Sequence, residues 1–107
     1  MYSLTLDVKR TRIVAAIRTF RDTDTAALFN RQRSRRFQSI ERVPRRKLLM
    51  LNNAQSLFDL RVPPANRLEE LQGNRQGQHS LRINDQWRLC FIWSERDAYD
   101  VEIVDYH

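Results

Sequence analysis

The spacing of apolar residues changes once along the chain, from a helical period to a period of two. Within residues 41–60, apolar side chains recur at helical spacing, at Leu48, Leu51, Ala54 and Leu57 or Phe58. Pro44 is compatible with the first turn of such a helix. Asn52 and Asn53 interrupt the pattern. We therefore expect a long helix, followed by a turn or a second helical piece near residues 56–60.

After Asn66 the apolar positions alternate, which is typical of strands. The alternating runs are residues 78–83, 87–93 and 98–104, joined by polar turns at 84–86 and 94–97. Short polar turns between such runs favour antiparallel hairpins. The preceding residues 66–72 also read as the start of a strand, with a glycine-bracketed turn at 73–77. The second half therefore predicts an antiparallel meander.

The first half predicts shorter elements. Residues 17–20 alternate like a short strand, and Asp22 or Asp24 is suited to cap a short helix that contains residues 26–29. The predicted fold class is α+β, with an N-terminal strand and two helices packed on an antiparallel sheet. We place one domain at residues 17–107. Residues 1–16 are a basic lead-in, either a genuine extension or the product of an upstream start.

The alternation assigns side chains to the two faces of the predicted sheet. One face carries Leu81, Ile83, Leu89, Phe91, Val101 and Ile103. If that face packs on the helices, Arg82, Arg88 and Glu102 point away from them. Arginines on neighbouring strands are a plausible platform for RNA, although a solvated sheet face carries charges as well.

Composition narrows the class of protein. The 107 residues carry a net charge of +6, and the first 54 contain 13 basic and 4 acidic residues. Such an excess favours contact with a polyanion, the alternative being a solvated basic surface. The single cysteine allows no internal disulfide, and no apolar run approaches the ~20 residues of a membrane span. We expect a small cytoplasmic protein.

Most candidate chemical groups have a structural interpretation. The chain has no nucleotide-binding glycine loop and no zinc-protease or hydrolase motif. Cys90 lies in an apolar strand and is expected in or near the core. Trp87 and Trp93 are expected to pack, and His79 to be a partly buried structural residue. One cysteine and two histidines are too few for an ordinary zinc site.

The last three residues, Asp105, Tyr106 and His107, are the exception, because they are polar and follow a predicted strand directly. RNA is cleaved without metal when its own 2′-OH attacks the adjacent phosphate. That reaction needs a base, an acid and a cation beside the developing negative charge. Histidine can serve as base or acid, and Arg88 can supply the cation. The alternative is a solvated tail.

Two segments of the chain resemble a known family. "NRLEELQGNRQGQHSLRINDQWRLCFIW" and "DVEIVDYH" resemble the HigB-type toxins of the RelE/ParE superfamily, including the GraT-like branch. The resemblance implies a RelE/ParE-like fold and a ribosome-dependent mRNA endonuclease that needs no metal or other cofactor. It also implies a toxin–antitoxin hetero-oligomer with a HigA-type helix-turn-helix antitoxin, and action on mRNA in the ribosomal A site.

The resemblance also assigns residues. The family's catalytic positions fall on Asp105, Tyr106, His107 and Arg88. Some relatives carry a histidine and a lysine in a "LHPLKG" segment, where this chain has Glu69 and Gln72. His107 is the leading acid or base, and Tyr106 orients or stacks. Asp105 positions these groups, or Glu69 and Asp105 assist proton transfer. We also expect the α-carboxylate of His107 to belong to the site and to favour the protonated imidazole.

Further residues are expected to contact RNA. These are Arg67, Arg75, Arg82 and Gln86, with the basic stretch 31–36. Two alternative functions stay open. One is a ParE-like inhibitor of DNA gyrase, and the other is a catalytically weak toxin that acts mainly as an antitoxin-binding co-repressor.

Overall fold

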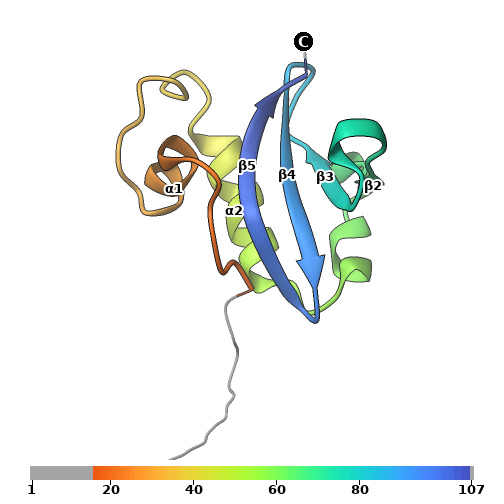
Figure 1. Cartoon of the computed structure of the whole chain (residues 1–107). Coiled ribbons are helices and arrows are strands. Elements are labelled where there is room, and N and C mark those ends of the chain that lie inside the picture. The colour runs from red at the N-terminus through yellow and green to blue at the C-terminus, as the bar shows by residue number, and fades with distance from the viewer. Residues whose placement is uncertain (1–15, 107) are drawn as a thin grey trace, which may run out of the picture.

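The computed structural model describes residues 16–106, and Figure 1 shows its helices α1 and α2 beside one antiparallel sheet. The strand order is β2-β3-β4-β5. The strands are β2 (Glu69–Glu70), β3 (Gln78–Arg82), β4 (Trp87–Ser94) and β5 (Asp97–Asp105). The α+β class and the antiparallel meander are therefore confirmed. Residues 1–15 of the predicted N-terminal extension lie outside the described residues.

Both predicted helices form close to their expected positions. Helix α1 (Thr23–Phe29) begins after Asp22, whose carboxylate accepts a 3.0 Å hydrogen bond from the backbone of Thr25. Helix α2 (Arg42–Asn53) is followed by a 3₁₀ helix (Leu57–Arg61), which is the predicted second helical piece. None of the helices between residues 16 and 106 is long and apolar enough to cross a bilayer.

The segment before α1 runs parallel to β5 instead of forming a continuous strand. Two isolated bridges join Ile17 to Ala98 and Phe20 to Val101. The predicted strand at residues 17–20 is therefore reduced to these two bridges. Ala16 is buried, and its carbonyl accepts a 2.7 Å hydrogen bond from Ala98. It thus packs with the domain, although the sequence placed it in the extension.

The strand predicted within residues 66–72 is much shorter than expected. Arg67 adopts a left-handed backbone conformation (φ 46°), which a pleated strand cannot include. Only the two residues of β2 then pair with β3. The following turn contains a 3₁₀ helix (Gly73–Arg75) and two glycines with positive φ, Gly73 and Gly77. This irregular segment supplies part of the site described below.

The hydrophobic core lies between the helices and one face of the sheet. It includes Leu28, Phe37, Leu48, Leu51, Leu81, Ile83, Leu89, Phe91, Val101 and Ile103. The predicted inward face is therefore confirmed. Trp87 and Trp93 pack against this core, and His79 is partly buried with its ring stacked 6.1 Å from that of Phe91. These three residues have the packing roles expected of them.

A bulge in β5 adjusts which side chains face the core. Cys90 pairs with Glu102, but Ile92 pairs with Tyr99, so β5 carries one extra residue between these pairs. Asp100 lies there with φ 52°, and its backbone donates a 2.8 Å hydrogen bond to the Thr19 hydroxyl. An extra residue shifts the alternation by one. Ala98 and Val101 consequently both face the core.

Candidate functional site

The sheet face opposite the helices, called the open face below, carries a row of polar side chains. It is formed by Ser80, Arg82, Arg88, Cys90 and Glu102. Ser80, Cys90 and Glu102 are neighbours across three strands, and Arg82 lies beside Arg88 in the adjoining row. Arg82, Arg88 and Glu102 are therefore on the face that the alternation predicted.

Arg88 is held by three protein groups on this face. Its Nε donates a 2.8 Å hydrogen bond to the hydroxyl of Ser80, and its Nη2 donates one of 2.7 Å to the carbonyl of Arg67. The carboxylate of Glu69 lies 3.5 Å from the same Nη2. Only 11% of the Arg88 side chain is exposed. Among residues 16–106, no group accepts a hydrogen bond from Nη1, so this nitrogen is the one left for a ligand.

The last described residue, Tyr106, lies beside Arg88. The centre of the tyrosine ring is 5.7 Å from the guanidinium carbon, within the range of a cation–π contact. The backbone of Tyr106 donates a 2.7 Å hydrogen bond to the carbonyl of Gln86, and the Gln86 amide donates one of 3.2 Å to Asp105. These bonds tie the end of β5 to the β3–β4 turn. His107 and its α-carboxylate lie outside the described residues.

Cys90 is buried on the open face. Its neighbours in β4, Leu89 and Phe91, belong to the core, so its own side chain projects to the other side of the sheet. There it lies close enough to Tyr106 for each group to shift the pKa of the other. Burial raises the pKa of the Cys90 thiol and also that of the Tyr106 hydroxyl. Cys90 is therefore near the core, as predicted, but it contacts the candidate site.

We expect the Cys90 thiol to react with dithiobis-nitrobenzoate at pH 8 at least about tenfold more slowly in the folded protein than in urea. Burial blocks access, and the raised pKa lowers the thiolate fraction. The chain has one cysteine, so the absorbance reports this thiol alone. Tyr106→Ala should accelerate the reaction, whereas Tyr106→Phe keeps most of the cover. Equal rates in folded and unfolded protein would show that Cys90 is not shielded.

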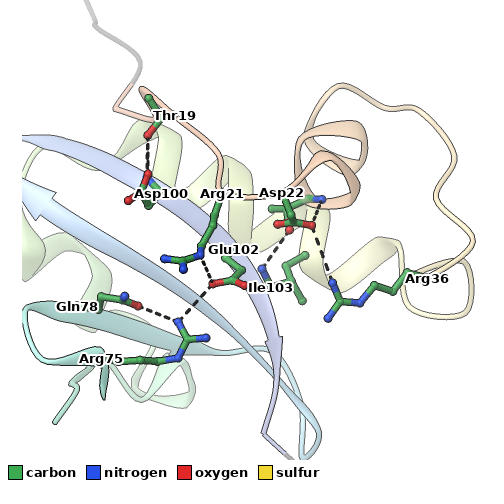
Figure 2. Close-up of polar contacts among 10 residues, drawn as sticks. Thr19, Arg21, Asp22, Arg36, Arg75, Gln78, Asp100, Glu102 and Ile103 are labelled. Carbon is green, nitrogen blue, oxygen red and sulfur yellow. Dashed lines mark hydrogen bonds and ion pairs between the residues drawn. The ribbon is translucent and has the colours of Figure 1, made fainter. Parts of the chain in front are cut away.

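Arg75 belongs to a second polar group on the open face. Its Nη1 donates to the carboxylate of Glu102 at 3.3 Å and to the side-chain oxygen of Gln78 at 3.0 Å. Arg21, just before α1, places its Nε 3.8 Å from the same Glu102 oxygen. Figure 2 shows Glu102 between the two arginines, with Gln78 beside Arg75.

The remaining predicted residues have different surroundings. Arg82 forms an ion pair with Asp85 in the β3–β4 turn. Arg67 contributes its carbonyl to the Arg88 contacts, while its side chain is exposed. Glu69, from β2, is 56% exposed and accessible to a ligand. The basic stretch 31–36 belongs to the loop between α1 and α2.

Sequence reasoning missed four contributors to these contacts. Ser80 and Gln78 could have been found, because both share the alternation of Arg82 on β3. The carbonyl of Arg67 and the side chain of Arg21 carry no such signal. Each reaches the open face through an irregular segment whose path depends on tertiary packing.

Comparisons with known proteins identify related chains. A family model described as "RelE-like toxin of type II toxin-antitoxin system HigB" matches residues 18–107. Toxin HigB-1 of Vibrio cholerae is 53% identical over 55 residues, which are 51% of this chain and 58% of that protein. Endoribonuclease HigB of Proteus vulgaris is 37% identical over 41 residues, 38% of this chain and 45% of that protein. The matched segments thus span about half the length of these curated relatives.

The fold has a counterpart among solved structures. The crystal structure of YafQ from E. coli superposes with a TM-score of 0.56 and 14% sequence identity. The superposition covers 86% of this chain and 93% of YafQ. At this identity the likeness concerns the fold.

Proposed function

The chain belongs to the RelE-like HigB toxin family of type II toxin–antitoxin systems, and we propose that it acts as the toxin of such a system by cleaving mRNA. The family match over residues 18–107 carries this proposal. One relative is named an endoribonuclease. The open face supports the same activity, because it combines a fixed guanidinium, an aromatic ring and an accessible carboxylate.

The proposed reaction is attack of the RNA 2′-OH on the adjacent phosphate. The 2′-oxygen forms a bond to phosphorus as the 5′-oxygen leaves, which yields a cyclic phosphate. Negative charge grows on the phosphate oxygens in the transition state, and a preorganised cation lowers its energy. Arg88 supplies that charge through Nη1, since its other contacts hold the guanidinium in place. The ring of Tyr106 stacks on a base or orients a proton.

Proton transfer requires one group to accept the 2′-OH proton and another to protonate the 5′-oxygen. We propose His107 as one of them, on the strength of its family position. Glu69 occupies the position where some relatives have histidine, and its exposed carboxylate next to Arg88 supports a role as the second group. Asp105 has a supporting role, because its bond with Gln86 helps hold Tyr106 beside Arg88.

The proposed partners follow from the family. We propose a HigA-type helix-turn-helix antitoxin, with which the chain forms a hetero-oligomer, and mRNA in the ribosomal A site as the substrate. Arg67, Arg75, Arg82 and the stretch 31–36 would contact RNA, because most of these arginines keep exposed or half-exposed guanidinium groups. We place this activity in the cytoplasm, where ribosomes and mRNA are found.

One observation favours a second candidate function. Glu69 presents a negative charge 3.5 Å from the guanidinium that would bind the phosphate. A carboxylate in that place competes with the substrate for Arg88. This position of Glu69 supports a weakly active toxin that serves mainly as an antitoxin-binding co-repressor.

Induced expression followed by mapping of mRNA 5′ ends separates the two functions. We expect growth arrest and new 5′ ends within open reading frames. The same purified protein should cleave mRNA only when ribosomes are present. Absence of arrest together with retained operator binding alongside the antitoxin would favour the co-repressor. Growth arrest with DNA damage and intact mRNA would contradict both candidates.

A further inference from the structure

Two arginines on the open face differ in how much of each guanidinium remains for a ligand. Arg88 donates through both Nε and Nη2 to protein acceptors. Arg75 donates through Nη1 alone, to Glu102 and Gln78. Within residues 16–106, no group accepts a hydrogen bond from Nε or Nη2 of Arg75. The edge formed by these two nitrogens is the one that grips a phosphate with two parallel hydrogen bonds.

The place of Glu102 is unusual for a surface that binds a polyanion. A carboxylate on such a surface repels phosphate. Glu102 nevertheless lies on the open face, in the same row as Cys90, and is 21% exposed. It contacts Arg75 and Arg21 at 3.3 and 3.8 Å, so the three side chains together keep one positive charge. Figure 2 shows both arginines directed at this one carboxylate. The group is therefore not a self-neutralised ion pair.

The position of this group relative to Arg88 follows from strand register. Glu102 pairs with Cys90, two residues along β4 from Arg88. Two residues of strand correspond to about 7 Å. Tyr106 lies between the groups, since its ring contacts Arg88 and its hydroxyl is close enough to Cys90 for the two groups to shift each other's pKa. A single RNA strand that crosses Tyr106 thus meets both guanidinium groups.

From these contacts we propose that Glu102 is a positioning residue, which with Gln78 presents the Nε–Nη2 edge of Arg75 to an RNA phosphate next to the one bound by Arg88. Arg21 adds charge at the outer end of this phosphate subsite. The inference rests on the proposed function, because it concerns the substrate of the same face. It identifies Arg75 as the bidentate phosphate ligand and assigns roles to Glu102, Gln78 and Arg21.

A matched pair of truncations tests the role of Glu102. Glu102→Ala and Asp97→Ala each remove one negative charge from β5. Glu102→Ala releases Arg75 and Arg21, whereas Asp97→Ala releases Arg18, which pairs with Asp97 at 3.1 Å. Bulk electrostatics predicts that both variants bind RNA more tightly. Positioning predicts that Glu102→Ala binds about five- to tenfold more weakly, while Asp97→Ala binds at least as tightly as the unchanged protein. Glu102→Gln keeps an acceptor for Arg75, and its RNA affinity should lie between that of Glu102→Ala and that of the unchanged protein.

The probe is a fluorescent single-stranded RNA with 2′-O-methyl sugars, whose affinity is measured by anisotropy over a range of salt concentrations. The methyl groups prevent 2′-OH attack, so binding is measured whether or not the protein cleaves RNA. Arg75→Lys keeps the charge and loses the planar edge, and it should weaken binding as much as Glu102→Ala. A protein with both Arg75→Lys and Glu102→Ala should bind RNA no more weakly than either single variant, because both substitutions remove the same contact.

Equal or tighter binding by Glu102→Ala would overturn the positioning role, as would additive effects in the double variant. A protein that shows no RNA binding at low salt would overturn the subsite itself. If the unchanged protein does not cleave mRNA but the variants bind RNA in the predicted order of affinity, only the nuclease function would be contradicted. Where cleavage occurs, Glu102→Ala should raise KM more than it lowers kcat, because Glu102 acts on substrate binding.

Discussion

Arg88→Lys should abolish growth arrest and lower ribosome-dependent mRNA cleavage by about 100-fold or more. Lysine keeps the positive charge but offers one ammonium in place of a planar group with five N–H donors. It cannot satisfy the Ser80 hydroxyl and the Arg67 carbonyl while also directing a donor at the phosphate. The variant therefore distinguishes the geometry of the cation from its charge.

The control is Arg96→Lys, which makes the same change in the β4–β5 turn. Arg96 is exposed, and its side chain forms no hydrogen bond or ion pair with residues 16–106. The Arg96→Lys variant should therefore cause the same growth arrest and mRNA cleavage as the unchanged protein. Primer extension on a reporter mRNA measures cleavage, and circular dichroism establishes that both variants fold. Undiminished cleavage by a folded Arg88→Lys protein would rule out Arg88 as the transition-state cation.

The structural consequence of Arg88→Lys should be smaller than its effect on cleavage. Ser80 is fully buried, so its hydroxyl loses a hydrogen-bond partner, which costs about 1–2 kcal/mol. A domain of this size tolerates such a loss and remains folded. Binding to the antitoxin should persist, which separates a loss of catalysis from a loss of structure.

Asn66→Leu should have the largest effect on stability among the substitutions considered, at about 3 kcal/mol or more of unfolding free energy. Asn66 is fully buried, and its amide donates to the carbonyls of Leu60 and Val62 at 3.1 and 3.3 Å. Its side-chain oxygen accepts a hydrogen bond from the ammonium of Lys47, which is also buried. Leucine leaves these groups without partners.

Thermal and urea denaturation measure this effect. The midpoint should fall by about 12 °C or more. Asn53→Leu, on the exposed end of α2, is the control and should change stability by less than about 0.5 kcal/mol. Adding Lys47→Met to Asn66→Leu should restore part of the loss, because the uncompensated charge is removed. A change below about 1 kcal/mol in Asn66→Leu would contradict this description of the buried pair.

The pH dependence of Lys47 follows from the same burial. Burial lowers the pKa of Lys47 from its ordinary value of 10.5, with Arg46 and Arg82 acting in the same direction. Between the folded and unfolded pKa values the unfolded chain binds more protons, so the free energy of unfolding rises with pH there. The difference in stability between unchanged protein and Lys47→Met should therefore vary across this alkaline interval and be constant below it.

The buried pair also connects stability with the site. Asn66 precedes Arg67, the residue whose carbonyl holds Arg88. The side chain of Asn66 fixes the loop at Leu60 and Val62, and thereby the position where Arg67 turns into the left-handed conformation. Asn66→Leu is accordingly expected to reduce cleavage even at temperatures where the variant is folded.

The local pattern of side chains was enough to predict much of this fold. The alternation at residues 78–104 determined three strands, their inward face and the outward placement of Arg82, Arg88 and Glu102. The helical spacing determined α2 and the 3₁₀ helix after it. Those features depend on contacts repeated every two or every three to four residues, which a single sequence records.

The irregular parts were decided by tertiary structure. The predicted strand does not begin at Asn66, because Arg67 lies in the left-handed region directly after the buried Asn66, whose side chain is bonded to the preceding loop. The segment at residues 17–20 pairs with β5 at two bridges, which depends on a bulge around Asp100 about 80 residues away. Contacts of such separation leave no periodic trace in one sequence.

The candidate site also combines features that the sequence predicts with features that depend on tertiary structure. Sequence by itself determined that Arg88 lies on an open sheet face and that Tyr106 follows the last strand. Only the tertiary structure decided that Arg88 donates through Nε and Nη2 to protein groups, and that Arg75 donates to Glu102 and Gln78 through Nη1 alone. The reason is that hydrogen-bond partners are set by the paths of loops, here residues 66–77, and these follow from packing rather than from local periodicity.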